Sequence, residues 1–258
     1  MSSILFEIKN SIAFITLNRP EKFNSFNRAM ALALQAALDE CASVQEVRCV
    51  YITGAGKAFS AGQDIGELTG ENKLEIKQIL SEHYNPIVKR IRNLAKPVVA
   101  AVNGVAAGAG ANIALCCDIV VAAEAASFIQ AFSKIGLIPD SGGTFTLPRL
   151  IGWQKASALM LTGDKISAAE AEKTGLLYKV FSNEQFEEES KKMAVTLSQM
   201  PTLALAMTKQ ALNSSFTNSW EEQLLLEDEL QQKAAATEDY REGISAFLEK
   251  RSPLFKGK

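Results

Sequence analysis

The sequence predicts an α/β domain built around a parallel sheet and followed by a helical region. Up to residue 181, short and almost continuous apolar strands alternate with helical segments, which is typical of parallel sheets covered on both faces. Two of the predicted strands are followed by glycine-rich loops, where open α/β sheets place their ligands. From residue 184 to residue 250 the apolar residues recur only with helical spacing.

Apolar periodicity and local breakers predict eight elements before residue 125. Met30, Leu34 and Leu38 recur every four residues, which predicts an amphipathic helix. Asn10 joins two short strands as a hairpin, and Pro97 ends a long helix because the residue before a proline disfavours helical backbone. In chain order the predicted elements are strands 4–8 and 12–17, helix 28–42, strand 47–52, helix 74–94, strand 97–102, helix 106–115 and strand 119–123.

The last part of the chain is predicted to be helical, with breaks at residues 200–201 and 213–218. One of its helices carries more apolar side chains than a free-standing helix would expose, namely Leu224, Leu225, Leu226 and Leu230. Such a surface indicates packing on a neighbour, for example another subunit. We therefore divide the chain into residues 1–198, a core with the substrate site, and residues 199–258, a helical region for oligomerisation.

Composition excludes several classes of function. The 258 residues are 47% hydrophobic and 22% charged, as in an ordinary globular protein, and the net charge of −2 provides no basic field for nucleic acid. The longest apolar runs, residues 97–102 and 119–123, are too short to span a membrane. Residues 1–9 lack the features of a secretory signal, and four irregularly spaced cysteines do not form a disulfide framework. We therefore expect a cytoplasmic protein.

Metal and nucleotide chemistry are also not expected. The chain has one histidine, His83, in a polar stretch where we expect it to be solvated or partly packed, so a zinc site has no ligand set. The loop at residues 54–64 is not a phosphate loop, because Ala58 follows Gly56-Lys57 where serine or threonine would stand. The loop at residues 103–112 lacks the spacing of a dinucleotide fingerprint.

What these two loops offer is exposed backbone N–H groups near a helix start. Two such donors that converge on one point make an oxyanion hole. The alternative is that their glycines and alanines merely permit close packing of helix on sheet.

The most informative segment is residues 134–144, which sets Asp140 in an otherwise apolar and glycine-rich turn. Pro139 fixes one backbone dihedral angle, while Gly142 and Gly143 let the chain turn tightly. Partial desolvation would raise the pKa of the Asp140 carboxyl toward values that suit proton transfer. The alternative is that Asp140 only forms a turn with Gly142 and caps the following helix.

Eight short motifs lie between residues 17 and 251, within a resemblance that extends from about residue 5 to residue 256. They are residues 17–25, 58–64, 96–104, 117–118, 135–144, 161–164, 168–176 and 239–251. In content and order they resemble the enoyl-CoA hydratase/isomerase family, also called the crotonase family. One motif alone is weak, whereas the full set in family order is specific.

The resemblance implies a crotonase-like spiral of ββα repeats with a C-terminal helical trimerisation region, which forms a homotrimer or a dimer of trimers. It implies an acyl-CoA thioester as the substrate and no separate cofactor. By position, the thioester carbonyl would be held between the backbone N–H groups of Gln63 and Ala109. Losing one such donor typically costs about 10²–10³ in rate.

This chain differs from the family's hydratases at the positions of their two catalytic glutamates. Family hydratases hold a water between two glutamates, where this chain has Asn112 and Phe132. The carboxylate stands instead at Asp140, where family isomerases use an aspartate. Together with the C-terminal residues 251–258, the segment around Asp140 most resembles the epoxyphenylacetyl-CoA isomerases of phenylacetate breakdown. One carboxylate can move a proton from C2 to C4 if the pocket excludes water, and Phe132 would help to keep it dry.

Further contacts with the acyl-CoA are implied at positions that match the family. These residues are Lys22, Asn24, Ala61, Asp64, Phe247 and Lys250, the last two sometimes acting from another subunit. The alternatives are that the lysines are solvated surface charges and that Asp64 caps the next helix.

Three functions therefore remain open. An acyl-CoA isomerase with Asp140 as the sole base is favoured over a hydratase that uses Asp140 and a water. A non-catalytic relative that keeps the fold is the third. The acyl group stays undetermined because the pocket is built from irregular loops such as residues 66–73.

Overall fold

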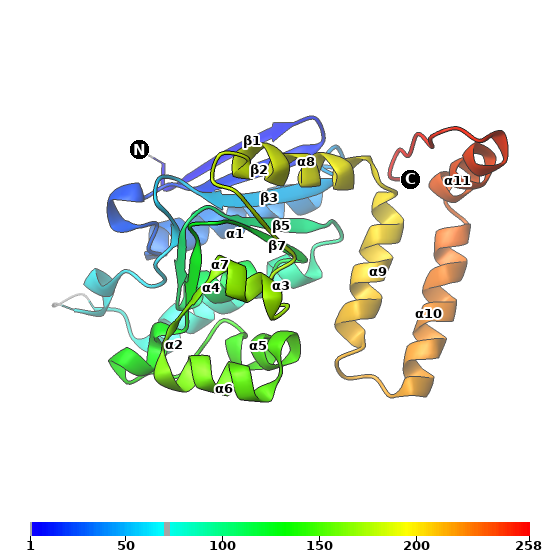
Figure 1. Cartoon of the computed structure of the whole chain (residues 1–258). Helices are drawn as coiled ribbons and strands as arrows, with labels where there is room; N and C mark the ends of the chain where they lie inside the picture. Colours follow the sequence, from blue (N-terminus) through cyan, green and yellow to red (C-terminus); the bar gives the residue numbers. More distant parts are fainter. Residues whose placement is uncertain (1, 70–72) are drawn as a thin grey trace.

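The computed structural model describes residues 2–69 and 73–258, whose strands form two sheets (Figure 1). The larger sheet has the order β1-β2-β3-β5-β7-β10, with β1 antiparallel to β2 and all other neighbours parallel. The smaller sheet has the order β4-β6-β8-β9, with β9 antiparallel to β8. The strands are β1 (Ile4–Lys9), β2 (Ile12–Leu17), β3 (Cys49–Gly54), β4 (Ala58–Ser60), β5 (Val98–Val102), β6 (Val105–Ala107), β7 (Ile119–Ala123), β8 (Ser127–Ile129), β9 (Lys165–Ser167) and β10 (Lys179–Phe181).

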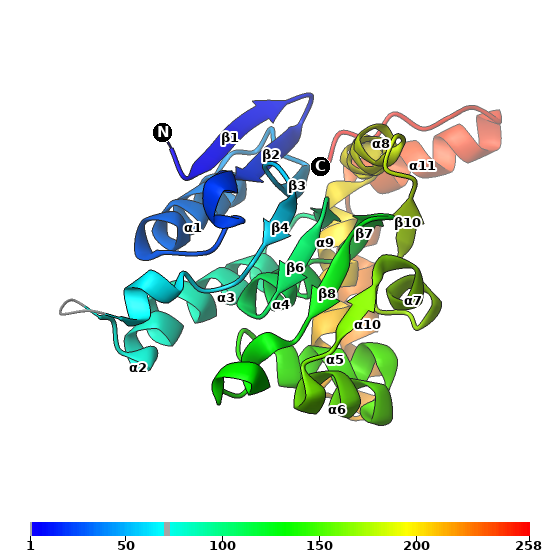
Figure 2. The ribbon, with the colours of Figure 1, turned by 60° about the vertical axis from the view of Figure 1, so that its left-hand side comes forward.

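Successive strands alternate between the two sheets, so that β3, β5 and β7 join the larger sheet while β4, β6 and β8 join the smaller one (Figure 2). A helical segment follows each pair, and the chain therefore rises as a spiral of strand–strand–helix turns. The predicted α/β fold with ββα repeats is confirmed.

Helices cover both faces of the larger sheet. Val50 and Ile52 point into the main core toward α1, whereas Cys49 and Tyr51 face α8, where the Tyr51 hydroxyl lies 2.8 Å from Ser190 Oγ. The helices are α1 (Arg28–Ser43), α2 (Ile76–Gln78), α3 (Asn85–Asn93), α4 (Ala109–Leu115), α5 (Gly143–Ile151), α6 (Trp153–Thr162), α7 (Ala168–Lys173), α8 (Phe186–Gln199), α9 (Thr202–Ser214), α10 (Trp220–Ala235) and α11 (Glu238–Glu249).

Most elements predicted before residue 125 are confirmed. The hairpin turns through Asn10 and Ser11, both at positive φ, and α1 ends one residue beyond its predicted end. The strand predicted at 47–52 lies two residues later, as β3. The helix predicted at 74–94 is present as α2, a π-helical segment η3 (Ile79–Tyr84) and α3.

Two predictions about this part of the chain were wrong. The predicted helix at 106–115 begins only at Ala109, because residues before Gly108 pair with β4 and β8 as strand β6. Gly108 then turns the chain at a φ of +52°. His83 is fully buried inside η3 rather than solvated or partly packed.

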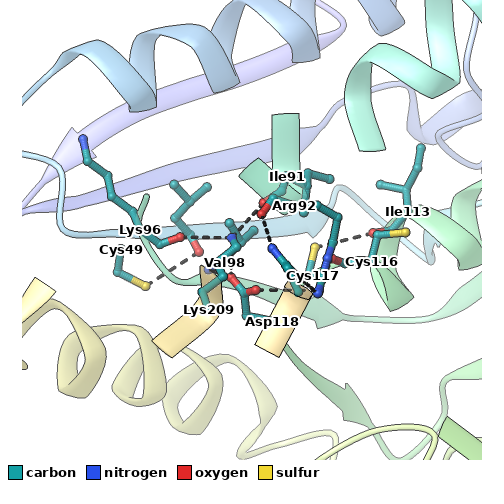
Figure 3. A network of polar contacts seen from close by, with 12 residues as sticks. Cys49, Ile91, Arg92, Lys96, Val98, Ile113, Cys116, Cys117, Asp118 and Lys209 are labelled. Atoms are coloured by element: carbon teal, nitrogen blue, oxygen red, sulfur yellow. Dashed lines mark hydrogen bonds and ion pairs between the residues drawn. The ribbon is translucent and has the colours of Figure 1, made fainter. Parts of the chain in front are cut away.

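The C-terminal helices stand beside the spiral, with α9 and α10 antiparallel to each other (Figure 1). A buried polar network fastens α9 to the core (Figure 3). Lys209 Nζ lies 2.7 Å from Asp118 Oδ2 and also donates to the carbonyls of Ile91 and Lys96. Asn213, one helical turn further on, pairs with Arg92. The boundary predicted at residue 198 stays a prediction, and it falls at the end of α8, which still packs on the sheet.

The C-terminal segment folds back onto this junction. Arg48 donates to the carbonyls of Phe255 and Met200, and the buried Asp239 carboxylate accepts from the N–H groups of Lys256 and Gly257. The segment therefore ties α11 to the beginnings of β3 and α9. Among the described residues, we find no helix with the length and apolar character needed to cross a bilayer.

Candidate active site

A cavity of about 770 Å³ lies where β4, β6 and β8 of the smaller sheet end. Parallel α/β sheets place ligands at these carboxyl ends because the loops that leave the strands converge there. Most of its wall is apolar. Side chains from η2 (Ile65–Leu68), α2, η3 and the segment before α5 form this wall, namely Ile65, Leu68, Ile76, Ile79, Leu80, Ala131, Phe132, Ile135, Leu137 and Ile138.

The two predicted oxyanion donors, the N–H groups of Gln63 and Ala109, belong to neighbouring loops that both line the cavity. Gly62, at a φ of +89°, packs so closely on the other loop that a Cβ would lie 2.9 Å from Ala107 O and 3.5 Å from Ala109 N. Gln63 comes directly after Gly62, Ala109 belongs to the other loop, and both residues line the cavity. In the described part of the chain, neither of their N–H groups donates a hydrogen bond. Both donors are therefore free to bind an oxygen atom that carries developing negative charge.

The Gln63 side chain is held away from these donors by hydrogen bonds of its own. Tyr84 from η3 donates its hydroxyl to Gln63 Oε1 at 2.7 Å, and Gln63 Nε2 donates to Glu67 Oε2 at 3.0 Å. Glu67 also accepts from the N–H of Arg28, at the start of α1. This chain of bonds fixes the loop of Gln63 to two helices.

Asp140 is half-buried and lines the cavity, as predicted. Its Oδ1 accepts a hydrogen bond of 2.8 Å from Ser141 Oγ. Burial raises the pKa of the Asp140 carboxyl, and the Ser141 hydroxyl partly offsets this by lowering the pKa. The carboxylate does not cap α5, whose N-terminal cap is Gly142 without a side-chain hydrogen bond. The capping alternative is therefore wrong.

Asn112 stands at the position of one of the two missing glutamates, and its role is structural. It is only 1% exposed, its Nδ2 donates to the Asp140 carbonyl at 2.9 Å, and its Oδ1 accepts from Gln130 Nε2 at 2.8 Å. A Cβ at Gly143 would collide with this amide, so glycine is required there. Asn112 thus fastens the turn that carries Asp140 and does not line the cavity.

Phe132 stands at the position of the second missing glutamate and does line the cavity. It is buried, and its ring lies 3.8 Å from the place of a Cβ on Gly108. An apolar ring here covers the loop of Ala109 and reduces the space for water.

The other predicted contact residues fall into three groups. Lys22, Ala61 and Asp64 line the cavity, with Lys22 and Ala61 exposed. Phe247 and Lys250 belong to the C-terminal end of α11 and do not line this cavity within the chain. Asn24 is buried and does not line the cavity.

Asn24 is fully buried and supports the loops. Its amide donates to the carbonyls of Ala55 and Ala58 and accepts from the N–H of Arg19, so the predicted substrate contact of this side chain was wrong.

Asp64 both caps η2 through the N–H of Gly66 and pairs with Arg19 at 2.8 Å. Burial raises the pKa of the Asp64 carboxyl, but the hydrogen bonds from Arg19 and Gly66 outweigh it and the pKa is lowered.

Sequence reasoning missed Tyr84 and Ser141. Tyr84 lies 21 positions after Gln63, and no local pattern signals that a buried tyrosine will reach a glycine-rich loop. Ser141 adjoins Asp140, and its place in a glycine-rich turn was the available signal.

The comparisons with known proteins agree with this geometry. The family model described as Enoyl-CoA hydratase/isomerase matches residues 7–258. The 1,2-epoxyphenylacetyl-CoA isomerase of Escherichia coli (strain K12) is 45% identical over 262 residues and covers 100% of both chains. A protein of Rhodobacter capsulatus named probable enoyl-CoA hydratase is 43% identical over 256 residues, covering 99% of this chain and 98% of the relative. The crystal structure of an enoyl-CoA hydratase from Bacillus anthracis superposes with a TM-score of 0.92 at 34% identity, covering 99% and 100% of the two chains.

Proposed function

Because the chain belongs to the enoyl-CoA hydratase/isomerase family, we propose that it is an acyl-CoA isomerase with Asp140 as its single proton-transferring group. One observation carries the proposal. Two carboxylates line the cavity, and Asp64 is held by Arg19, whereas Asp140 is half-buried with a raised pKa and no ion pair within the described residues. Asn112 and Phe132 stand where a hydratase would hold its water between two acids.

The proposed reaction moves a double bond from C3 to C2. The Asp140 carboxylate takes a proton from C2 of a 3-enoyl thioester, and the electrons of that C–H bond shift onto the thioester oxygen. The N–H groups of Gln63 and Ala109 stabilise the resulting enolate. When the enolate collapses, Asp140 returns the proton to C4, so that the carboxylate is regenerated and no water is consumed.

The acyl group is the finer part of the proposal. The E. coli relative named 1,2-epoxyphenylacetyl-CoA isomerase is 45% identical to this chain. An epoxyphenylacetyl thioester also presents an acidic C2 proton beside a carbonyl, so the same base and the same oxyanion donors serve its ring isomerisation. We propose the CoA thioester as substrate, without a separate cofactor, and with Lys22, Ala61 and Asp64 at the nucleotide end of the cavity.

The test is to incubate the protein with a 3-enoyl-CoA and, separately, with crotonyl-CoA, and to follow the products by chromatography. We expect conversion of the 3-enoyl to the 2-enoyl thioester and little hydration of crotonyl-CoA. Asp140→Asn should reduce isomerisation by about 10²–10⁴-fold, the usual contribution of general acid–base catalysis. Asp164→Asn, at an exposed position, is the matched control.

Rapid hydration of crotonyl-CoA that survives Asp140→Asn would refute this proposal. The hydratase function, which is also the function named for the R. capsulatus relative, would then replace it. Loss of both reactions in the variant would instead show that Asp140 serves hydration as well.

A further inference from the structure

Ser141 has a backbone conformation that its side chain disfavours. Its φ is +53°, in the left-handed region, where a Cβ approaches the following carbonyl oxygen. The residue is only 3% exposed, and it is followed by two glycines. Glycine adopts a positive φ without this steric cost, yet position 141 carries a serine. Strained positions that persist in a buried turn beside a reactive group indicate a functional requirement.

The side chain of Ser141 has one hydrogen bond, and it leads to the catalytic group. Ser141 Oγ donates to Asp140 Oδ1 at 2.8 Å, while the Ser141 carbonyl is contacted by the buried Cys116 thiol at 3.4 Å. Glycine would relieve the backbone but would remove this hydroxyl. In the described part of the chain, Asp140 Oδ2 accepts no hydrogen bond, and Asp140 lines the cavity.

We propose that Ser141 is a positioning residue that holds Oδ1 of Asp140 so that Oδ2 faces the substrate, and that the strained backbone at this position is kept for that purpose. The inference rests on the proposed function of Asp140 as the base. It extends that function by assigning a different role to each oxygen of the carboxylate: Oδ1 is held by Ser141 and Oδ2 transfers the proton.

Among the described residues, the Ser141 hydroxyl is the polar group that lowers the pKa of the Asp140 carboxyl. The other titratable groups that line the cavity are Lys22, Asp64, Tyr84 and Lys134. Within the described residues, none of them forms a hydrogen bond or an ion pair with the Asp140 carboxylate. Removing the Ser141 hydroxyl therefore takes away a hydrogen bond that lowers the pKa and leaves burial, which raises it.

The experiment compares Ser141→Ala, which keeps the strain and loses the hydroxyl, with Ser141→Gly, which loses both. Three quantities are measured: the thermal midpoint, the pH dependence of kcat/KM for a 3-enoyl-CoA, and the pKa of Asp140. The pKa is read by carbon-13 NMR of protein labelled at the aspartate carboxyl, with Asp140→Asn to assign the signal. Ser11→Gly is the control, because Ser11 also has a positive φ, +62°, but lies in the β1–β2 turn away from the cavity.

We expect Ser141→Gly and Ser11→Gly to raise the thermal midpoint. Only the Ser141 variants should lose about tenfold in kcat, the scale of one hydrogen bond to a charged group, with KM little changed. Both Ser141 variants should shift the Asp140 pKa and the acidic limb of the rate profile to higher pH.

An unchanged Asp140 pKa in both variants, or full activity in Ser141→Gly, would overturn the inference. If the wild-type protein does not isomerise the substrate, the proposed function fails. The NMR titration then still decides the inference, because a raised pKa supports control by Ser141 and an unchanged pKa refutes it.

Discussion

At the scale of single residues, the site places a carboxylate where it weakens the fold. Asp140 is half-buried among apolar side chains and its turn is fastened from behind by Asn112. Water would solvate the charged carboxylate better than this cavity does. The position is therefore maintained by its surroundings rather than by any stability that the charge contributes.

We predict that Asp140→Asn stabilises the protein at neutral pH. Burial raises the native pKa of Asp140 above its unfolded value, so between these two values the native state binds more protons than the unfolded state. Stability therefore falls as the pH rises through this window, and the cost persists at pH 7. Thermal unfolding should show a higher midpoint for the variant at pH 7 and none of this advantage near pH 3, below the unfolded value of about 3.9. Equal midpoints at pH 7 would contradict the prediction.

Part of the site was predictable at this scale and part was not. A lone carboxylate after Pro139 and two glycine-rich loops are local signals, and Asp140, Gln63 and Ala109 from these segments line the cavity, while their catalytic roles stay predictions. The hydrogen bond between Tyr84 and Gln63 joins an η3 helix to a loop, and the support of Asp140 by Asn112 crosses 28 positions. Such partners depend on tertiary packing, which no short pattern encodes.

At the scale of elements, the η3 helix contains an unsatisfied group. His83 is fully buried, and neither ring nitrogen has a hydrogen-bond partner in the described part of the chain. The backbone of η3 is π-helical, a form that is rare and frequently occurs at functional sites. Tyr84, which supports Gln63, is the last residue of the same segment.

We predict that His83→Leu protects the protein against mild acid. Burial lowers the native pKa of His83 below its usual value of about 6.5; Glu67 and Glu82 oppose this to a smaller extent, while Arg28 adds to the lowering. As the pH falls below 6.5, the unfolded state takes up the proton first, and stability is lost down to the native pKa. Urea unfolding at pH 7.5 and pH 5 should show a smaller loss in the variant. An identical loss in both proteins would show that His83 does not determine the acid sensitivity.

A second element-scale prediction concerns the attachment of α9. Lys209 is buried and bonds to Asp118 and to two carbonyls (Figure 3). Lys209→Met removes the closer cationic partner of Asp118 and leaves Arg92, 3.9 Å away, so we expect a loss of about 3 kcal/mol in the free energy of unfolding, measured in urea. Lys233→Met, which breaks an exposed pair with Glu229, should change it by less than about 0.5 kcal/mol. A similar small effect for both variants would show that other contacts hold α9.

The sequence predicted long elements well and short ones poorly. Helix α1 and the C-terminal helices carry several turns of apolar spacing, so their existence was clear. Strands β4, β6 and β8 have three residues each, too few for alternation to appear. Strand β6 was read as the start of a helix, because its small residues continue into α4 without a change of composition and only the turn at Gly108 separates them.

At the scale of the whole molecule, the cavity and the C-terminal helices lie in different parts of the chain. The last helix, α11, is joined to the spiral chiefly by the returning C-terminal segment, through Asp239 and Arg48. Phe247 and Leu248 on this helix are 81% and 74% exposed. Adjacent exposed side chains of this size favour burial against another chain.

The family resemblance implies a homotrimer or a dimer of trimers, and we predict that α9–α11 form its contacts, because α11 leaves these apolar side chains exposed. Native mass spectrometry should give three or six times the mass of one chain. Replacing both Phe247 and Leu248 by glutamate should shift the mass toward the single chain, because each buried glutamate would lose its solvation. Lys192→Glu, at an exposed position on α8, should leave the mass unchanged.

A further variant, compared with the dissociated double variant, tests whether α11 serves the cavity of a neighbour. Phe247 and Lys250 lie outside the cavity of their own chain, so a role in binding the nucleotide of the substrate requires a second subunit. If that role is real, Lys250→Ala should raise KM for an acyl-CoA in a protein of unchanged native mass, with kcat largely retained. A KM that rises only when the assembly dissociates would assign α11 to assembly alone. A native mass of one chain for the unaltered protein would contradict both roles.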